Sequence, residues 1–513
     1  MRVGPLAGIL ASSALLVLTF PGPDMGWLAP VALVPLFFSV RFQGAGRAFF
    51  YGWLAGLIWF FVSLNWISRT LSRYGGFSFP LSQLPIVLMA AILALYPGAF
   101  TAVVPLVKRA GGPWPAIVLP SVWVLTEVAR SRFPAPFPWL ILGSGFWRTS
   151  LILPLYGVVG VFGVSFLSVL AGVVLLEAIE SVVDGNRRRL LTRVAVLLVL
   201  AIAALLPGYF SGDEGAWRPI TVSVVQGDFP QEIKWEGSMK ENILDTYLGL
   251  SAGAALSGSD LIVWPEAAVT FYYQTEMDLA DRIRNFTRKE NVDLVFGSPA
   301  FAIRDGKVIY LNRAYHVEPD GGEEWYDKIK LVPFGEYIPF HRVLGFLEKM
   351  VPGAGEFASG GMKGPFTTPV PAGTLICFES TFPYLAREEV RRGAGILLNL
   401  TNDAWFGKTW GPRQHLAASA VRAAENGVPL IRAANTGISA IFDRKGRMVK
   451  SIGLFQRGTI TATLETGGKR TFYNRSGDLI VYISAFVILL FALRKLSVTR
   501  RRPWKIWKDS NSP

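Results

Sequence analysis

Long apolar stretches constrain the fold of this chain more than any other feature of its sequence. A helix needs about 20 apolar residues to cross the hydrocarbon core of a bilayer. Seven stretches of this kind precede residue 210, and an eighth lies near the C-terminus. They run over residues 3–20, 25–42, 48–67, 84–107, 111–129, 151–180, 190–209 and 476–493. The sequence therefore predicts a multi-span α-helical membrane domain.

These stretches also set the predicted domain boundaries. We expect a membrane domain with seven transmembrane helices over residues 1–210 and an extramembrane domain over residues 211–472. An eighth transmembrane helix is expected over residues 473–495, followed by a basic tail over residues 496–513. The second, fifth and eighth stretches are the weakest candidates for membrane spans, because each is short or is interrupted by proline, glycine or a charge. No small-residue cleavage pattern follows the first stretch, so we expect it to be retained rather than removed as a signal peptide.

Composition and charge narrow the class of protein further. The chain is 51% hydrophobic and only 17% charged, whereas soluble domains carry about a quarter charged residues. Its net charge of +14 sits largely in clusters beside the apolar stretches, and no basic stripe accompanies a nucleic-acid-reading element, so we expect no nucleic-acid partner. The single cysteine excludes an intramolecular disulfide framework. The histidines are His316, His341 and His415, and because they are widely spaced we expect no zinc site.

Lysine and arginine in short loops predict the topology, because cytoplasmic loops are enriched in them. With the N-terminus in the cytoplasm, the inner loops carry Arg41, Arg47, Lys108, Arg109, Arg187, Arg188, Arg189 and Arg193. The outer loops carry fewer basic residues, and the C-terminal tail carries seven, from Arg494 to Lys508. Residues 210–475 are therefore predicted to lie outside the cytoplasmic membrane.

Two features of the membrane half need a reason, because a bilayer penalises polar groups. Glu127 lies near the end of the fifth stretch, beside Arg130. The pair is either an interfacial ion pair or a site that faces lipid or substrate, and the sequence leaves both interpretations open. Residues 133–147 are rich in proline and aromatic side chains, which is typical of an anchor at the membrane interface.

From about residue 216 the pattern changes to short β-branched runs alternating with amphipathic segments. The expected strands are 220–225, 261–264, 292–296, 308–317, 374–377, 396–399 and others within 438–461, and the expected helices are 238–254, 276–290, 382–393 and 412–426. Alternation of this kind predicts an α/β domain.

Three segments of this domain place a reactive residue at the end of a strand or in a loop. Glu266 follows a strand and a proline, and partial burial would raise its pKa and make it a usable base. The segment 326–337 carries two lysines and a second glutamate around a Pro-Phe-Gly turn. Cys377 ends an apolar strand. Taken singly, the three segments are more typical of a solvated glutamate, a charged loop and an inert packed cysteine.

Taken together, the segments resemble the nitrilase superfamily, whose catalytic residues are Glu, Lys and Cys in this order. The shared motifs are WPE at 264–266, YDKIKLVPFGEYIP at 326–339, ICFES at 376–380, LNLTNDAWFG at 398–407 and further positions over 414–425. With eight spans, VVQGDFPQEIKW at 224–235 and FPWLILG at 137–143, the whole chain resembles the apolipoprotein N-acyltransferase family of bacterial envelopes. The resemblance implies a nitrilase-like αββα sandwich for the extramembrane domain.

The resemblance also implies roles for single residues. Glu266 matches the general base, Lys328 the catalytic lysine and Cys377 the nucleophile. Supporting positions are Glu336, Phe378 and Glu379, and Trp235 matches a tryptophan at the lipid entrance. Many members have tyrosine where this chain has Phe378, so a role for that hydroxyl is in doubt, although the backbone N–H at 378 remains available to an oxyanion.

The implied reaction needs no cofactor and no metal. A glycerophospholipid donates an acyl chain to Cys377, and the resulting thioester acylates the α-amine of the S-diacylglyceryl cysteine of an apolipoprotein. Such an enzyme lies in the bacterial inner membrane with its catalytic domain on the periplasmic side. Residues 340–370, with apolar Leu344, Phe346, Leu347, Met350, Phe357 and Met362, are hypothesised to form a lid. A membrane-tethered amidase and a non-catalytic lipid-binding or assembly protein remain as alternatives, whereas a fused sugar transferase would lack a domain of its own.

Overall fold

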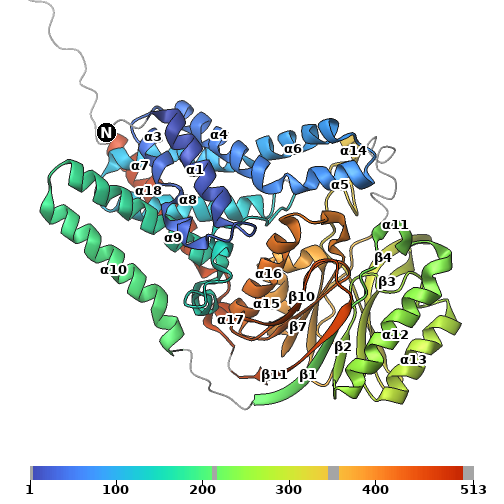
Figure 1. Cartoon of the computed structure of the whole chain (residues 1–513). Helices are drawn as coiled ribbons and strands as arrows, with labels where there is room; N and C mark the ends of the chain where they lie inside the picture. Colours follow the sequence, from blue (N-terminus) through green and yellow to red (C-terminus); the bar gives the residue numbers. More distant parts are fainter. Residues whose placement is uncertain (1–3, 134, 211–216, 345–356, 469, 501–513) are drawn as a thin grey trace, which may run out of the picture.

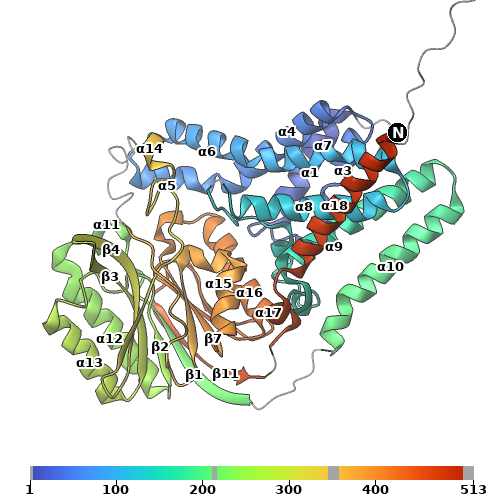
Figure 2. The same cartoon turned by 180° about the vertical axis from the view of Figure 1, so that it is seen from behind.

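The computed structural model describes residues 4–133, 135–210, 217–344, 357–468 and 470–500. It has two parts, a helical part that contains the N-terminal helices and an α/β part that lies against one side of it (Figure 1). The C-terminal helix α18 (Leu479–Arg500) returns to the helical part and packs against α8 and α9 (Figure 2). Of the proposed lid, residues 340–370, the central residues 345–356 lie outside the described residues, so the lid remains a hypothesis.

The helical part follows the predicted apolar stretches closely. Its helices are α1 (Pro5–Thr19), η1 (Gly26–Leu28), α2 (Ala29–Ala32), α3 (Val34–Val40), α4 (Ala45–Leu64), α5 (Trp66–Tyr74), α6 (Phe79–Leu93), α7 (Leu95–Ala110), α8 (Trp114–Arg130), η2 (Leu142–Phe146), α9 (Leu153–Val183) and α10 (Arg187–Phe210). The second stretch is divided into three short pieces, with Pro30 and Pro35 in the first turns of α2 and α3, because proline supplies no N–H to a continuing helix.

Five helical segments of the described chain are long and apolar enough to cross a membrane, judged by length and composition. They are Ala45–Leu64, Phe79–Ala110, Leu153–Val183, Arg187–Pro207 and Leu479–Ser497. The first two predicted spans correspond to shorter apolar helical segments, Pro5–Thr19 and Gly26–Val40, and the fifth to the 17-residue helix α8. Eight spans therefore remain a prediction.

The α/β part contains two sheets. One has the strand order β11-β1-β2-β3-β4-β5 and the other β10-β9-β8-β7-β6. The strands are β1 (Trp217–Gln226), β2 (Leu261–Val263), β3 (Asp293–Arg304), β4 (Lys307–Val317), β5 (Glu323–Asp327), β6 (Ala372–Ile376), β7 (Ile396–Thr401), β8 (Leu430–Ala434), β9 (Ser439–Phe442), β10 (Met448–Ile452) and β11 (Gly458–Gly467). Strands β1, β2 and β3 are parallel neighbours, as are β6, β7 and β8.

Buried side chains show how the layers stack. One apolar cluster joins residues of both sheets, such as Val222, Leu261, Ile376 and Leu398. Helices α12 (Lys240–Leu256) and α13 (Met277–Glu290) cover the first sheet, and α15 (Pro383–Arg391) and α16 (Gly411–Asn426) cover the second (Figure 1). The αββα sandwich and its α/β class are thus confirmed.

The short helices of this part are α11 (Gln231–Lys234), η3 (Gly237–Met239), α14 (His341–Leu344), η5 (Cys377–Thr381), η6 (Asp403–Phe406) and α17 (Phe472–Ser476).

The predicted strands and helices of this part are all present, most of them within a few residues at their ends, although β3 continues eight residues beyond the predicted strand 292–296. Two strands were not predicted, β5 and β8. Strand β5 carries the charged residues that favour a loop when read alone, yet it pairs with β4 at the sheet edge. Strand β8 contains Arg432, a residue type that is rarely fully buried but is so here.

Candidate active site

Cys377 lies at the sharp turn between β6 and η5. Its φ angle of 52° is in the left-handed region, which costs a residue other than glycine about 1–3 kcal/mol. The side chain is 9% exposed. The turn projects the thiol from the carboxyl end of a parallel strand, at the sheet edge where substrates of open α/β sheets commonly bind.

Glu266 and Lys328 meet beside this turn. The Lys328 ammonium lies 3.3 Å from Oε1 of Glu266 and 2.8 Å from Oε1 of Glu336. The Asn312 amide donates to both carboxylates, over 2.7 Å and 3.1 Å, and the backbone N–H of Asn402 donates to Oε2 of Glu266 over 2.8 Å. The structure therefore brings together Glu266, Lys328 and Glu336 as predicted, and it adds Asn312.

Burial and charge set the protonation states at this site. Burial, together with the nearby Glu266 carboxylate, raises the pKa of the Cys377 thiol well above its usual value. Burial alone would raise the pKa of Glu266, but the Lys328 ammonium and the hydrogen bonds from Asn312 and Asn402 outweigh it and lower the pKa of that carboxyl. Glu266 and Glu336 likewise outweigh burial and raise the pKa of Lys328. At neutral pH the site holds a thiol, a carboxylate and an ammonium.

This result corrects one expectation. The sequence predicted that burial would raise the pKa of Glu266, and the direction is wrong because the prediction ignored the ammonium 3.3 Å away. An ionised Glu266 is still a base toward a neutral thiol, since it starts without a proton.

Glu379 fixes the Lys328 segment onto the turn. Its Oε1 accepts the backbone N–H groups of Ile329 and Lys330 over 2.6 Å and 2.9 Å. Its Oε2 accepts the N–H of Ile376 over 2.7 Å and the hydroxyl of Tyr326 over 3.0 Å. One fully buried carboxylate thus joins the residue before the nucleophile candidate to the loop that carries the lysine.

Phe378 lies among aromatic rings from both parts of the molecule. Its ring stacks on Trp139, with centroids 6.3 Å apart, and meets Phe382 edge-on at 5.1 Å. Trp139 belongs to the segment 133–147, which was predicted to be an interfacial anchor. That prediction is wrong for its second half, because Trp139, Leu142 and Trp147 are buried inside the protein.

The Glu127–Arg130 pair acts on the same segment. Arg130 donates to the carbonyl groups of Phe137, Trp139 and Leu140, and Glu127 accepts the N–H of Leu142 over 2.7 Å. Both side chains are 3% exposed. The pair therefore holds a loop in place, because the partners of both residues lie on the chain segment that folds back over them. This role differs from the two interpretations of the sequence, an interfacial ion pair and a site that faces lipid or substrate.

Gln414 on α16 connects the two parts. Its Oε1 accepts the indole N–H groups of Trp66 and Trp139 over 3.0 Å and 2.8 Å, and its amide donates to the carbonyl of Ser63 over 3.0 Å. We call these four residues the junction. Through Trp139 the junction reaches the ring of Phe378.

Trp235, the predicted lipid-entrance residue, lies at the end of α11 with 49% of its surface exposed. The preceding residue, Lys234, was missed by sequence reasoning. It is fully buried, its ammonium lies 3.4 Å from the Glu266 carbonyl, and burial lowers its pKa to about 8. A lysine in an amphipathic segment gives no signal of burial.

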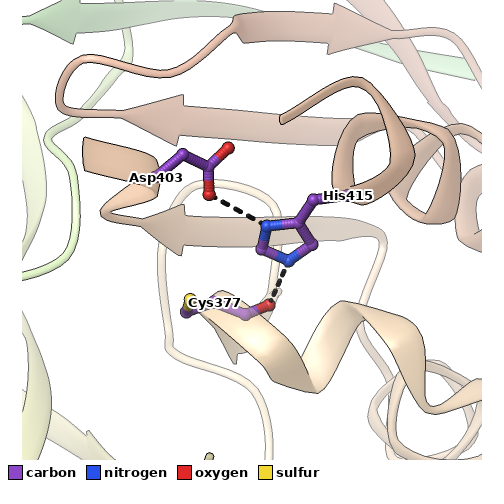
Figure 3. A group of neighbouring side chains, drawn as sticks. All are labelled: Cys377, Asp403 and His415. Atoms are coloured by element: carbon purple, nitrogen blue, oxygen red, sulfur yellow. Dashed lines mark hydrogen bonds and ion pairs between the residues drawn. The ribbon is translucent and has the colours of Figure 1, made fainter. Parts of the chain in front are cut away.

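Asp403 and His415 were also missed as site residues. Figure 3 shows them beside Cys377, with ligand-type atoms of the three residues within 4.8 Å of one another. The sequence gives no signal of this approach, since Asp403 and His415 lie on different elements, η6 and α16. Asp403 forms an ion pair with the buried Arg432 at 2.6 Å, and Nε2 of His415 lies 2.9 Å from the backbone carbonyl of Cys377. The three residues are therefore linked by an ion pair and hydrogen bonds.

Known proteins match both parts of the chain. The family model for carbon-nitrogen hydrolases matches residues 221–471, and that for the apolipoprotein N-acyltransferase N-terminal domain matches residues 12–174. The apolipoprotein N-acyltransferase of Geobacter metallireducens is 37% identical over 95% of both chains. That of Nitrosomonas europaea is 31% identical over 94% of this chain and 96% of its own. Among solved structures, Nit3 of Saccharomyces cerevisiae, of the nitrilase superfamily, is 18% identical over 48% of this chain and 90% of its own, with a TM-score of 0.37.

The sandwich, with a cysteine at its strand-end turn and a carbon-nitrogen hydrolase match, defines a nitrilase-type catalytic domain. The matches continue through the N-terminal helices and cover nearly the whole length of the relatives. The chain belongs to the apolipoprotein N-acyltransferase family and is an acyltransferase.

Proposed function

We propose that this enzyme moves an acyl chain from a membrane glycerophospholipid to the α-amine of the S-diacylglyceryl cysteine of apolipoproteins, through a thioester on Cys377. The observation that carries the proposal is the buried ion pair of Glu266 and Lys328, 3.3 Å apart, beside the left-handed turn that presents the buried Cys377. The relatives named as apolipoprotein N-acyltransferases support the choice of acceptor.

In the first half-reaction, Glu266 takes the proton of the Cys377 thiol as sulfur attacks the ester carbonyl of the phospholipid. The Lys328 ammonium and backbone N–H groups, including that of Phe378, stabilise the oxyanion, which is often the largest catalytic contribution. The carbon–oxygen ester bond then breaks. The departing lysophospholipid oxygen receives the proton from Glu266, and the acyl group remains on sulfur.

In the second half-reaction, the lipoprotein amine attacks the thioester carbonyl. Glu266 accepts the proton that the amine loses, the carbon–sulfur bond breaks, and the proton passes to the Cys377 sulfur. The product is an amide and the free enzyme. Because Cys377 is 9% exposed and Glu266 7% exposed, little water reaches the thioester while it waits for the amine.

The supporting residues act on this pair. Glu336 holds the Lys328 ammonium at 2.8 Å, and Glu379 holds the lysine segment against the turn. Phe378 contributes its backbone N–H, and its ring closes the site on the side of the membrane part. Trp235, half exposed at the end of α11, contacts the acyl chains of the entering lipid.

A membrane location suits these substrates, because acyl chains hold both of them in the bilayer. We propose that the enzyme lies in the bacterial inner membrane with the catalytic domain on the periplasmic side, where it completes lipoprotein maturation. The clustering of Lys and Arg in the predicted inner loops supports this orientation.

The test is intact-mass analysis of the detergent-solubilised full-length enzyme after incubation with phospholipid and no acceptor. We expect one acyl adduct, mapped to Cys377 and released by hydroxylamine. Glu266→Gln should slow its formation by about 100- to 10,000-fold, the usual contribution of a general base, and Cys377→Ala should abolish it.

The matched control is Glu276→Gln, which makes the same change at a surface ion pair with Lys240 and should leave the adduct intact. A diacylglyceryl peptide added to the isolated acyl-enzyme should then be N-acylated. No adduct, combined with hydrolysis of small amides by the same preparation, would refute the proposal in favour of a tethered amidase.

A further inference from the structure

The backbone carbonyl of Cys377 is held by an unusual number of donors. Nε2 of His415 lies 2.9 Å from this oxygen, the Ser380 hydroxyl 3.1 Å and the Asn399 amide 3.3 Å. A carbonyl oxygen has two lone pairs, so three converging donors fix its direction firmly. The residue so held has a left-handed backbone conformation, with φ of 52°, and it relaxes toward commoner angles unless the surroundings prevent it.

Two of the donors, His415 and Asn399, are held in turn by Arg432, a fully buried residue of β8. One guanidinium nitrogen donates to the Asn399 side-chain oxygen, and another pairs with Oδ2 of Asp403 at 2.6 Å. Oδ1 of Asp403 lies 2.9 Å from Nδ1 of His415. His415 and Asp403 are each 1% exposed, so water does not compete for these bonds.

Nε2 of His415 faces the Cys377 carbonyl at 2.9 Å, which can only accept, and the Ser380 hydroxyl at 3.1 Å, which can accept or donate, so the carbonyl contact favours a proton on Nε2. The Asp403 carboxylate favours a second proton on Nδ1, whereas burial and the Arg432 guanidinium, 3.1 Å from Nδ1, oppose it and lower the pKa of the ring. The charged ring carries a proton on Nε2, and the neutral ring carries it there in the tautomer whose Nδ1 accepts from Arg432. In both of these forms Nε2 donates to the Cys377 carbonyl.

His415 is not placed to act as the base toward the thiol. Figure 3 shows Nε2 directed at the carbonyl oxygen of Cys377, whereas the sulfur lies at the other end of that residue. The ring therefore acts on the backbone of the nucleophile and leaves the thiol proton to another group.

We infer that His415, oriented by Asp403 and Arg432, is a positioning residue that locks Cys377 in its left-handed conformation and so presents the thiol to Glu266 and Lys328. The inference rests on the proposed function in one respect, the assignment of Cys377 as the nucleophile. It adds a requirement on α16, the helix that carries His415.

The test uses the fact that the chain has a single cysteine, so iodoacetamide alkylation reports on Cys377 alone. We would measure the alkylation rate across pH and the rate of acyl-enzyme formation in full-length His415→Leu and His415→Gln. Leucine removes the donor, and both rates should fall by about 10- to 100-fold. Glutamine keeps an N–H donor of similar reach and should restore both rates to within about threefold.

The matched control is His316→Leu. His316 is also buried and also bridges acidic groups, with Asp293 at 2.6 Å and Glu324 at 3.1 Å. Its loss should lower the melting temperature but leave the alkylation rate of the folded protein unchanged. If His415→Leu is too unstable to purify, His415→Asn replaces it, because the shorter amide does not reach the carbonyl and should behave like leucine.

The inference is overturned if His415→Leu is alkylated at the wild-type rate. It is also overturned if glutamine is as slow as leucine, or if His316→Leu slows alkylation to the same extent. The proposed function has a separate test. An acyl adduct that persists in Cys377→Ala would show that Cys377 is not the nucleophile, whereas the alkylation rates would still report how His415 holds Cys377.

Discussion

Replacing Gln414 by leucine should uncouple the catalytic domain from the membrane part. Leucine is similar in size but neither donates nor accepts, so the two indole N–H groups of Trp66 and Trp139 and the carbonyl of Ser63 lose their partner. A buried group left unpaired costs about 1–3 kcal/mol. The N–H of Trp139, which is 5% exposed, and the carbonyl of the buried Ser63 each carry the full cost, whereas the more exposed Trp66 regains water, so the total is about 2–6 kcal/mol.

The assay compares thermal unfolding in detergent, followed by near-ultraviolet circular dichroism, with the rate of Cys377 acylation. We expect Gln414→Leu to melt several degrees lower and to acylate more slowly, because Trp139 no longer supports the ring of Phe378 and α16 is less firmly held. Gln274→Leu is the control. That glutamine also makes three hydrogen bonds, to Phe301 twice and to Tyr315, all within the catalytic domain.

The control should lose a similar amount of stability and keep its acylation rate per folded molecule. The reasoning is wrong if Gln414→Leu melts and acylates like the unchanged protein. It is also wrong if both glutamine variants lose acylation equally, because the effect would then be a general loss of stability.

Three further predictions concern the site and its supports. The Lys328 ammonium and the hydrogen bonds to Glu266 lower the pKa of that carboxyl, so the charged form and the stability it contributes are lost only when pH falls below the ordinary value of 4.5. The acylation rate should therefore show no loss of the base down to about pH 5. A rate midpoint near pH 6 that Glu266→Gln abolishes would contradict this. Arg130→Met should lower the melting temperature and the acylation rate because three loop carbonyls lose their donor, while Arg109→Met, at an exposed position, should do neither. Trp235→Ala should raise KM for phospholipid and leave kcat unchanged, and a loss confined to kcat would exclude an entry role.

Much of the candidate site could be predicted from the sequence because strand ends can be recognised there. An apolar run that stops at Cys377 or just before Pro265 marks the edge of a sheet, and in parallel sheets those edges converge. The order of Glu266, Lys328 and Cys377 then matched a known family. Strand β8 was missed for the opposite reason, since Arg432 interrupts the apolar pattern and its burial depends on partners such as Asp403 and Asn399.

By itself, the sequence determined which segments are apolar enough for a membrane, most of the strands and helices, and which residues are candidates for the reaction, because these depend on local composition and on motifs. Only the tertiary structure decided the charge of Glu266, the burial of Trp139 and the contact of His415 with the carbonyl of Cys377. Each of these depends on a partner far away in the chain, and electrostatic and hydrogen-bond energies depend on distances that no local pattern of residues records.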